Sequence, residues 1–205
     1  MKRLITVLLG ACLSMAAQAD SSDVLTVKEM VELTQYHRVG ADRDPVLRGM
    51  SITKRIPKGW VDDVSERYIR TIVDDEGITR HQVLLEVRYV GGWRYYRAAS
   101  LADGQELAFN AEERRFSRCS SAFLKCDQRE VVTAELSHEQ LKDAMTNGLA
   151  VYFDAKKPGR DTVAQFPPAY VLAYLIKLDG EDAVLPAGGE TEKSKVVAIN
   201  ASRGF

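Results

Sequence analysis

This chain of 205 residues contains only three cysteines. It also has no large excess of positively or negatively charged side chains. Lysine and arginine total 28 against 29 aspartates and glutamates. Nucleic-acid-binding domains usually display a basic face or stripe, which this balance does not provide. After residue 19, no stretch reaches the roughly 18 apolar residues that a membrane-spanning helix needs. The composition therefore argues against nucleic-acid partners and against a transmembrane span.

The sequence also lacks the short motifs of common enzyme classes: it has no G-x-S-x-G, no H-E-x-x-H, no P-loop and no Gly-rich dinucleotide turn. Ser137–Glu139 holds three reactive side chain types, but consecutive helical residues point in different directions and form no relay. His81 with Glu86 resembles a proton shuttle, yet a single histidine at the start of a strand is more often structural. We expect no catalysis and no cofactor, since an enzyme would need a cleft that gathers distant residues such as His37, His81 and Glu86.

The first residues have the pattern of a secretory signal. A basic start precedes an apolar run over residues 4–17, and A-x-A follows at 17–19, ahead of Asp20. We expect signal peptide 1–19 to be cleaved after Ala19, so that the protein is periplasmic or secreted. The alternative is a lipobox at 9–12, which would make an outer-membrane lipoprotein anchored at Cys12. That alternative leaves an apolar core shorter than the roughly 7 to 15 residues of a typical signal.

Cleavage after Ala19 leaves two cysteines, Cys119 and Cys126, in an oxidising compartment. Two thiols do not supply a four-ligand zinc site, and the three histidines are scattered without H-x(3 to 5)-H spacing, so we expect no metal. The spacing is not the C-x-x-C of a thioredoxin-like device either. We predict a structural disulfide between Cys119 and Cys126, with free thiols and intermolecular pairing as the alternatives.

Alternating apolar and polar residues predict the strands of an antiparallel sheet. Residues 80–89 show this period-2 pattern most clearly, as expected of a half-buried strand. The Gly-Gly pair at 91–92 predicts a two-residue hairpin turn, and Asp-Gly at 103–104 predicts the next reversal. Short connections favour an antiparallel meander because parallel strands need long crossovers. We predict further strands over 67–73, 93–100, 106–116, 129–136 and 149–153.

Two capping-box patterns predict helices, one beginning after Thr26 and the other after Ser137. The segment 166–180 is apolar on nearly all sides and must be buried; Pro167-Pro168 favours a helix there, although a strand is the alternative. The fold predicted for residues 20–180 is one α+β domain, an antiparallel β-sheet meander packed by two to three helices, with one disulfide-stapled loop. Residues 181–205 are expected to form a flexible C-terminal tail.

The segment Trp93–Arg97 is the most informative candidate for a binding surface. Alternation places Trp93, Tyr95 and Arg97 on one face of a strand, and Arg94 on the other. If the first face is open to solvent, its rings and guanidinium group would stack on a sugar or pair with a carboxylate or phosphate. The alternative, which we favour from sequence, buries Trp93 and Tyr95 in the core while the arginines extend along the sheet.

The stretches GGWRYYRAASLADGQEL, GLAVYFDAK and FPPAYVLAYL, with Cys119 and Cys126 ahead of Glu130, resemble uncharacterised secreted proteins and lipoproteins of Gram-negative bacteria. The resemblance spans residues 65–178 and implies an envelope location and a disulfide loop, without an activity. We therefore expect a non-catalytic secreted envelope accessory or protein-interaction module, with another envelope protein as its partner. The alternative is a binding protein for a small ligand, a glycan or an anionic headgroup, that uses the Trp93–Arg97 surface.

Overall fold

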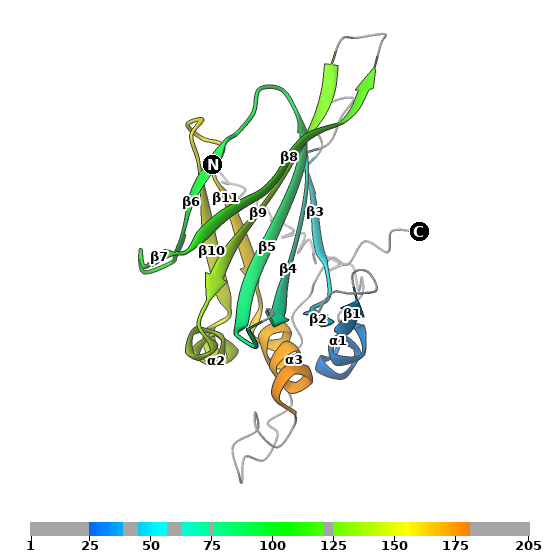
Figure 1. Ribbon diagram of the computed structural model, residues 1–205, viewed down its shortest axis with the longest axis vertical. Helices are drawn as coiled ribbons and strands as arrows, with labels where there is room; N and C mark the ends of the chain where they lie inside the picture. The colour runs from blue at the N-terminus through cyan, green and yellow to red at the C-terminus, as the bar shows by residue number, and fades with distance from the viewer. Residues whose placement is uncertain (1–24, 39–44, 57–62, 74–75, 121–124, 181–205) are drawn as a thin grey trace, which may run out of the picture.

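The computed structural model describes residues 25–38, 45–56, 63–73, 76–120 and 125–180. They form two antiparallel sheets with three helices gathered at one end, which confirms the α+β class and the antiparallel pairing (Figure 1). The expected signal peptide 1–19, Cys12 and the expected tail 181–205 lie outside the described residues.

The larger sheet has seven strands in the order β1-β2-β4-β5-β9-β8, with β3 also paired to β4. The smaller sheet has four strands in the order β11-β10-β6-β7. The strands of the larger sheet are β1 (Gln35–Arg38), β2 (Pro45–Arg48), β3 (Ile52–Ile56), β4 (Asp63–Val73), β5 (Thr79–Val90), β8 (Phe109–Ser120) and β9 (Lys125–Leu136). Those of the smaller sheet are β6 (Tyr96–Leu101), β7 (Glu106–Leu107), β10 (Leu149–Ala155) and β11 (Thr162–Phe166).

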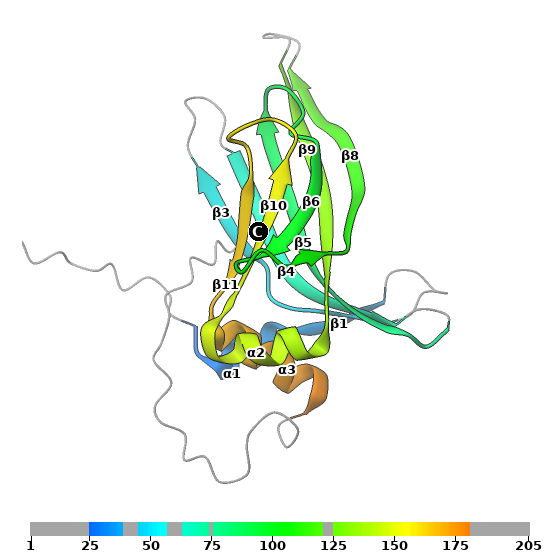
Figure 2. The same ribbon diagram turned by 90° about the vertical axis from the view of Figure 1, so that its left-hand side faces the viewer.

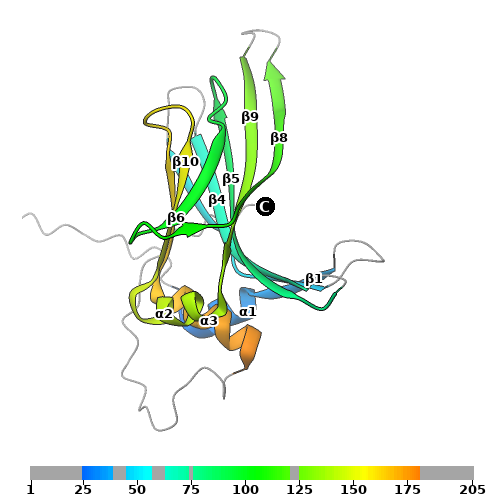
Figure 3. The same ribbon diagram turned by 60° about the vertical axis from the view of Figure 1, so that its left-hand side comes forward.

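The connection after β5 differs from the sequence prediction. Gly91 and Gly92 do not turn the chain into a hairpin, because β5 pairs with β4 and β9 whereas β6 pairs with β10 and β7. The chain crosses from the larger sheet to the smaller one over Gly91–Tyr95, which we call the crossing segment. Trp93, Tyr95 and Arg94 lie in the crossing segment, ahead of the first strand residue, Tyr96. The strands therefore form two sheets that face each other and are not one meander (Figure 3).

Three helices lie across the lower end of the two sheets (Figure 2). They are α1 (Val27–Leu33), α2 (His138–Asn147) and α3 (Pro168–Asp179). Both predicted capping boxes are present, at Thr26 with Glu29 and at Ser137 with Gln140. Within the segment 166–180, α3 is the helix that the proline pair predicted, while Phe166 ends β11; Gly180 ends the helix at a φ of 89°.

Two tyrosines attach α3 to the larger sheet. The Tyr170 hydroxyl accepts a hydrogen bond from the Ile69 N–H at 3.2 Å and donates one to the Met50 carbonyl at 2.7 Å. The Tyr174 hydroxyl lies 2.6 Å from the Thr71 hydroxyl. Burial raises the pKa of both phenols, so they remain protonated and serve as fixed hydrogen-bonding groups. These contacts position α3 over a hydrophobic core that both sheets share.

Candidate functional site

The crossing segment between β5 and β6 adopts an unusual backbone. Gly91 has a φ of 128°, and Tyr95 is a residue other than glycine with a positive φ, 55°. Holding a tyrosine in this region costs on the order of 1–3 kcal/mol, so the surroundings must impose it. The N–H groups of Arg94 and Tyr95 point at one carboxylate oxygen, Oε1 of Glu130, at 2.9 and 3.4 Å. Glu130, which lies on β9, therefore fixes the backbone of the crossing segment at Arg94 and Tyr95.

Glu130 lies on β9 with 1% of its surface exposed. It also accepts a hydrogen bond from the Tyr89 hydroxyl and one, at 3.1 Å to Oε2, from the Arg114 Nε. Burial first, and then the hydrogen bond to Glu130, raises the pKa of Tyr89, so this phenol stays a donor. A buried carboxylate is tolerated only where donors and a cation surround it, and Glu130 has both.

Arg94 is buried beneath the crossing segment. Its Nη2 lies 2.8 Å from Oδ2 of Asp63 on β4, and its guanidinium carbon lies 4.2 Å from the centre of the Tyr89 ring. Its Nη1 lies 3.2 Å from the hydroxyl of Tyr96, whose pKa is raised by burial. Within the described residues the Nε of Arg94 makes no hydrogen bond. Arg94 turns inward, while its neighbours in the chain are less buried: Trp93 is half-buried and Tyr95 is exposed.

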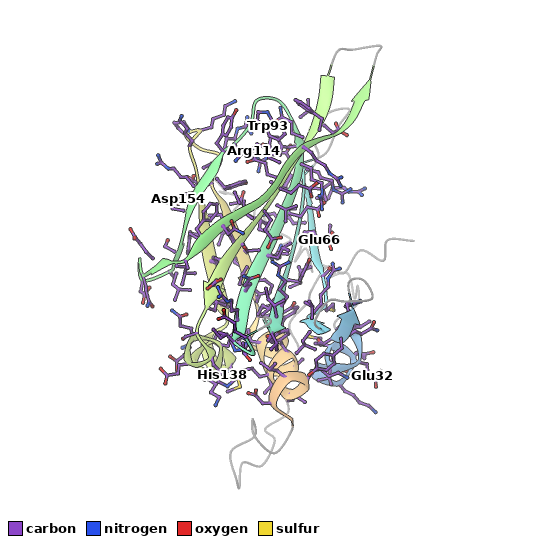
Figure 4. All side chains as sticks on the ribbon, viewed as in Figure 1. Glu32, Glu66, Trp93, Arg114, His138 and Asp154 are labelled. Carbon is purple, nitrogen blue, oxygen red and sulfur yellow. The ribbon has the colours of Figure 1, made fainter. Side chains whose placement is uncertain are left out.

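We define the aromatic platform as Trp93, Tyr95, Arg114 and Phe116. The Trp93 and Phe116 rings lie 5.1 Å apart between centres, and the Arg114 guanidinium carbon lies 4.6 Å from the centre of the Tyr95 ring and 6.0 Å from that of Trp93. Tyr95 is 44% and Phe116 56% exposed. Trp93 and Arg114 are neighbours near the end of the sheets opposite the helices (Figure 4). The arrangement is an aromatic and cationic surface, with Tyr95 and Phe116 exposed and Trp93 half-buried, on a buried polar support.

Lysines from the β10–β11 connection lie along the other side of the crossing segment. The Lys156 N–H donates to the Tyr95 carbonyl at 3.0 Å, and the Lys157 N–H donates to the Arg94 carbonyl at 3.3 Å. The Lys157 Nζ lies 3.6 Å from the position that a β-carbon on Gly92 would occupy. Both lysines are exposed. A pair of lysines from one strand connection therefore borders the crossing segment that carries Trp93 and Tyr95.

The predicted binding residues divide into two groups. Trp93 and Tyr95 belong to the aromatic platform, whereas Arg97 is exposed on β6 and no contact among the described residues joins it to the two rings. The favoured prediction that Trp93 and Tyr95 are core is wrong for Tyr95, which is exposed because the crossing segment lies ahead of the sheet, whereas Trp93 is half-buried. Arg114 and Phe116 were missed, because the run Glu112–Arg115 mixes both signs of charge and such runs are typical of solvated surface.

The two cysteines of the predicted disulfide are Cα partners in the β8–β9 register. Directly opposed residues of antiparallel strands have Cα atoms about 4.5–5.5 Å apart, within the roughly 4.4–6.8 Å that a disulfide spans. The side chains of Cys119 and Cys126 lie outside what the structure describes, so the disulfide itself stays a prediction.

A second polar cluster joins the larger sheet to two helices. His81 on β5 is buried and its Nδ1 lies 2.7 Å from the hydroxyl of Thr71, which also contacts Tyr174. The His138 ring at the start of α2 lies 5.3 Å from the His81 ring, and its Nε2 lies 3.2 Å from Oδ2 of Asp179 at the end of α3. Glu86 does not join His81: its carboxylate binds Arg129 instead. The enzyme hypothesis built on His81 and Glu86 gains no geometric support.

The buried position of His81 predicts a pH-dependent stability. Burial, with a smaller effect of neighbouring His138, lowers the pKa of His81 below its ordinary value of 6.5. At this side chain the folded state therefore binds fewer protons than the unfolded chain, so the contribution of His81 to the free energy of unfolding should fall as the pH drops below about 6.5. Urea titrations between pH 7.5 and 5 should show this fall, and His81→Asn should reduce it. His37→Asn, at an exposed position on β1, should leave it unchanged; equal slopes for all three proteins would contradict the assignment.

No helix among those described is long and apolar enough to cross a bilayer. Within the same residues, no three histidine, cysteine, aspartate or glutamate side chains gather closely enough to hold a metal ion. Comparison with known proteins found no matching family model, curated protein or solved structure. The function must therefore be argued from the aromatic platform and its support.

Proposed function

We propose that the protein is a non-catalytic interaction module of the cell envelope, and that the aromatic platform is its contact surface for a protein partner. One observation carries the proposal: Trp93, Tyr95 and Arg114 lie together at the surface, and these are the residue types that dominate binding energy in protein interfaces. Glu130 binds the backbone N–H groups of Arg94 and Tyr95 and the Nε of Arg114 before any partner arrives, so little ordering is needed on binding. The secretory pattern of residues 1–19 supports an exported, periplasmic location.

The partner can be captured by a photoreactive amino acid placed at Tyr95 in cells. A matched control carries the same group at Tyr152, which is 39% exposed on the smaller sheet, away from the aromatic platform. We expect a protein to be cross-linked from position 95, with a yield at least about tenfold lower in Phe116→Ser, the loss typical of a residue central to binding. Equal capture from positions 95 and 152, or no effect of Phe116→Ser, would contradict the proposal.

The alternative, a glycan or anionic-headgroup binding protein, rests on the same exposed rings. A Trp60→Phe variant leaves Trp93 as the single tryptophan, whose fluorescence reports on the aromatic platform. Protection of this fluorescence from a soluble quencher by envelope glycans or lipid vesicles would favour the alternative. We expect no such protection, because a protein partner is the ligand proposed.

We further propose that Cys119 and Cys126 form the disulfide that staples the β8–β9 hairpin. Breaking it with Cys119→Ser should lower the free energy of unfolding by about 2–3 kcal/mol on the chain-entropy model. Urea titrations of the oxidised protein with and without reductant measure the effect. The double variant Cys119→Ser/Cys126→Ser should match the reduced wild type; a reductant-insensitive wild type would disprove the bridge. The intact mass of the exported protein should correspond to a chain that begins at Asp20. This mass should increase by two hydrogens when the disulfide is reduced.

A further inference from the structure

The strand that supplies half of the aromatic platform is also an unpaired edge. β8 is the last strand of the larger sheet, and within the described residues no strand pairs with its other side along Glu113–Phe116. Such an edge presents a row of backbone N–H and C=O groups to which an extended segment can add as a further strand. Arg114 and Phe116 project from this stretch toward the crossing segment, where they meet the rings of Trp93 and Tyr95.

Two irregularities limit where a strand can add. The β8–β9 register shifts between Ala111 and Glu113 and again between Phe116 and Arg118. Bulges of this kind twist an edge and discourage indiscriminate pairing. The regular stretch that remains, Glu113–Phe116, is short, so backbone pairing there is weak without help from side chains. The aromatic platform stands beside this stretch and provides such help.

The polar groups around the aromatic platform select an acidic occupant. The Nε of Arg114 donates a hydrogen bond to Glu130. No hydrogen bond within the described residues involves the two terminal nitrogens of Arg114. Lys157 borders the segment from the other side. Arginine and lysine only donate hydrogen bonds, so they bind acceptors, and carboxylates most strongly. On the opposite face of β8, Glu113 is already paired with Arg115 and Arg129.

We propose that the regular stretch Glu113–Phe116 binds an extended acidic segment of the partner protein by strand addition. Residues on neighbouring strands oppose each other at about 4.5–5.5 Å, and alternate residues share a face. The segment should therefore carry an acidic residue opposite Arg114 and an apolar residue two positions away, opposite Phe116. This inference rests on the proposed function and specifies the chemistry of the partner.

The test uses the full exported protein and a short blocked peptide in which threonine alternates with glutamate and phenylalanine. A peptide with lysine in place of glutamate is the matched control, and phosphatidylglycerol vesicles and hyaluronate are the rival probes. Binding is followed by Trp93 fluorescence in Trp60→Phe and by amide hydrogen exchange along β8. We expect the acidic peptide to protect alternate amides of Glu113–Phe116, and Phe116→Ser or Lys157→Glu to weaken binding at least about fivefold.

Three results would overturn the inference. Equal binding of the acidic and lysine peptides would show that the site does not select an acidic segment. Binding without protection of the β8 amides would show that the peptide does not add to β8 as a strand. Binding of vesicles or hyaluronate but not of the acidic peptide would show that the anion comes from a lipid or a glycan. If cross-linking from position 95 still captures a protein that depends on Phe116, the proposed function stands and only the acidic strand is wrong. If that capture also fails, the proposed function fails with it.

Discussion

Replacing Glu130 with alanine is expected to lower the free energy of unfolding by about 3–5 kcal/mol, the range for removing one partner from a buried charged network. The change would remove the shared acceptor of two backbone N–H groups, the Tyr89 hydroxyl and the Arg114 Nε, and of these only the Arg94 N–H has a second acceptor, the Tyr89 hydroxyl at 2.9 Å. Unpaired buried polar groups carry the full cost of desolvation. Urea titration at pH 7.5, followed by circular dichroism, measures the loss.

Glu135 offers a matched control on the same strand. Its side chain is 38% exposed and pairs with Arg80 at 3.6 Å, so Glu135→Ala should cost less than about 1 kcal/mol, as surface ion pairs do. The isosteric change Glu130→Gln separates shape from charge, because the amide keeps one acceptor but loses the attraction to Arg114. We expect it to fall between the other two variants. A Glu130→Ala loss no larger than that of Glu135→Ala would show that Glu130 does not hold the crossing segment.

Replacing Gly49 with alanine is expected to destabilise the protein by about 2–3 kcal/mol, through overpacking and the loss of a hydrogen bond. A β-carbon on Gly49 would lie 2.5 Å from the Tyr170 hydroxyl, closer than non-bonded atoms approach. The chain has no freedom to move away, because the Gly49 N–H is bound to the Ile69 carbonyl at 2.8 Å. Tyr170 would have to give up its bonds to the Ile69 N–H and the Met50 carbonyl.

A double-mutant cycle tests this explanation. Tyr170→Phe removes the hydroxyl that the new methyl group meets, so Gly49→Ala should cost about half as much or less in that background. Gly92→Ala is the control, since its β-carbon would meet nothing nearer than the flexible Lys157 Nζ at 3.6 Å, and it should change stability by less than about 0.5 kcal/mol. Additive effects of Gly49→Ala and Tyr170→Phe would contradict the steric account.

Local patterns predicted local structure well. The capping boxes after Thr26 and Ser137 are present, because each depends on contacts within one turn of helix. Gly148 ends α2 ahead of β10, at a φ of 78° that glycine adopts without strain. The helical prediction within 166–180 was correct, but the apolar pattern did not show that Tyr170 and Tyr174 bind the larger sheet.

The candidate site depended on pairings between distant parts of the chain. The Gly-Gly pair at 91–92 has the composition of a hairpin turn, yet β9 takes the place beside β5 that such a hairpin would have filled. The partners of Trp93 and Tyr95 come from β8 and β9, and only the register, with Arg114 opposite Glu130, brings them together. The sequence therefore identified Trp93 and Tyr95, which are half of the aromatic platform. Nothing in the sequence distinguished Glu130, the buried carboxylate that fixes the platform, from the other acidic residues.

The hold of Glu130 on the crossing segment also has a kinetic consequence. The bond from the Arg94 N–H spans 36 positions of the chain, so the segment cannot be fixed until β9 has been made and has paired with β5. Contacts of this separation form late, since the intervening chain must first lose its freedom. Substitutions in the crossing segment should therefore speed unfolding more than they slow refolding. The aromatic platform would therefore reach its final geometry only after most of the larger sheet has formed.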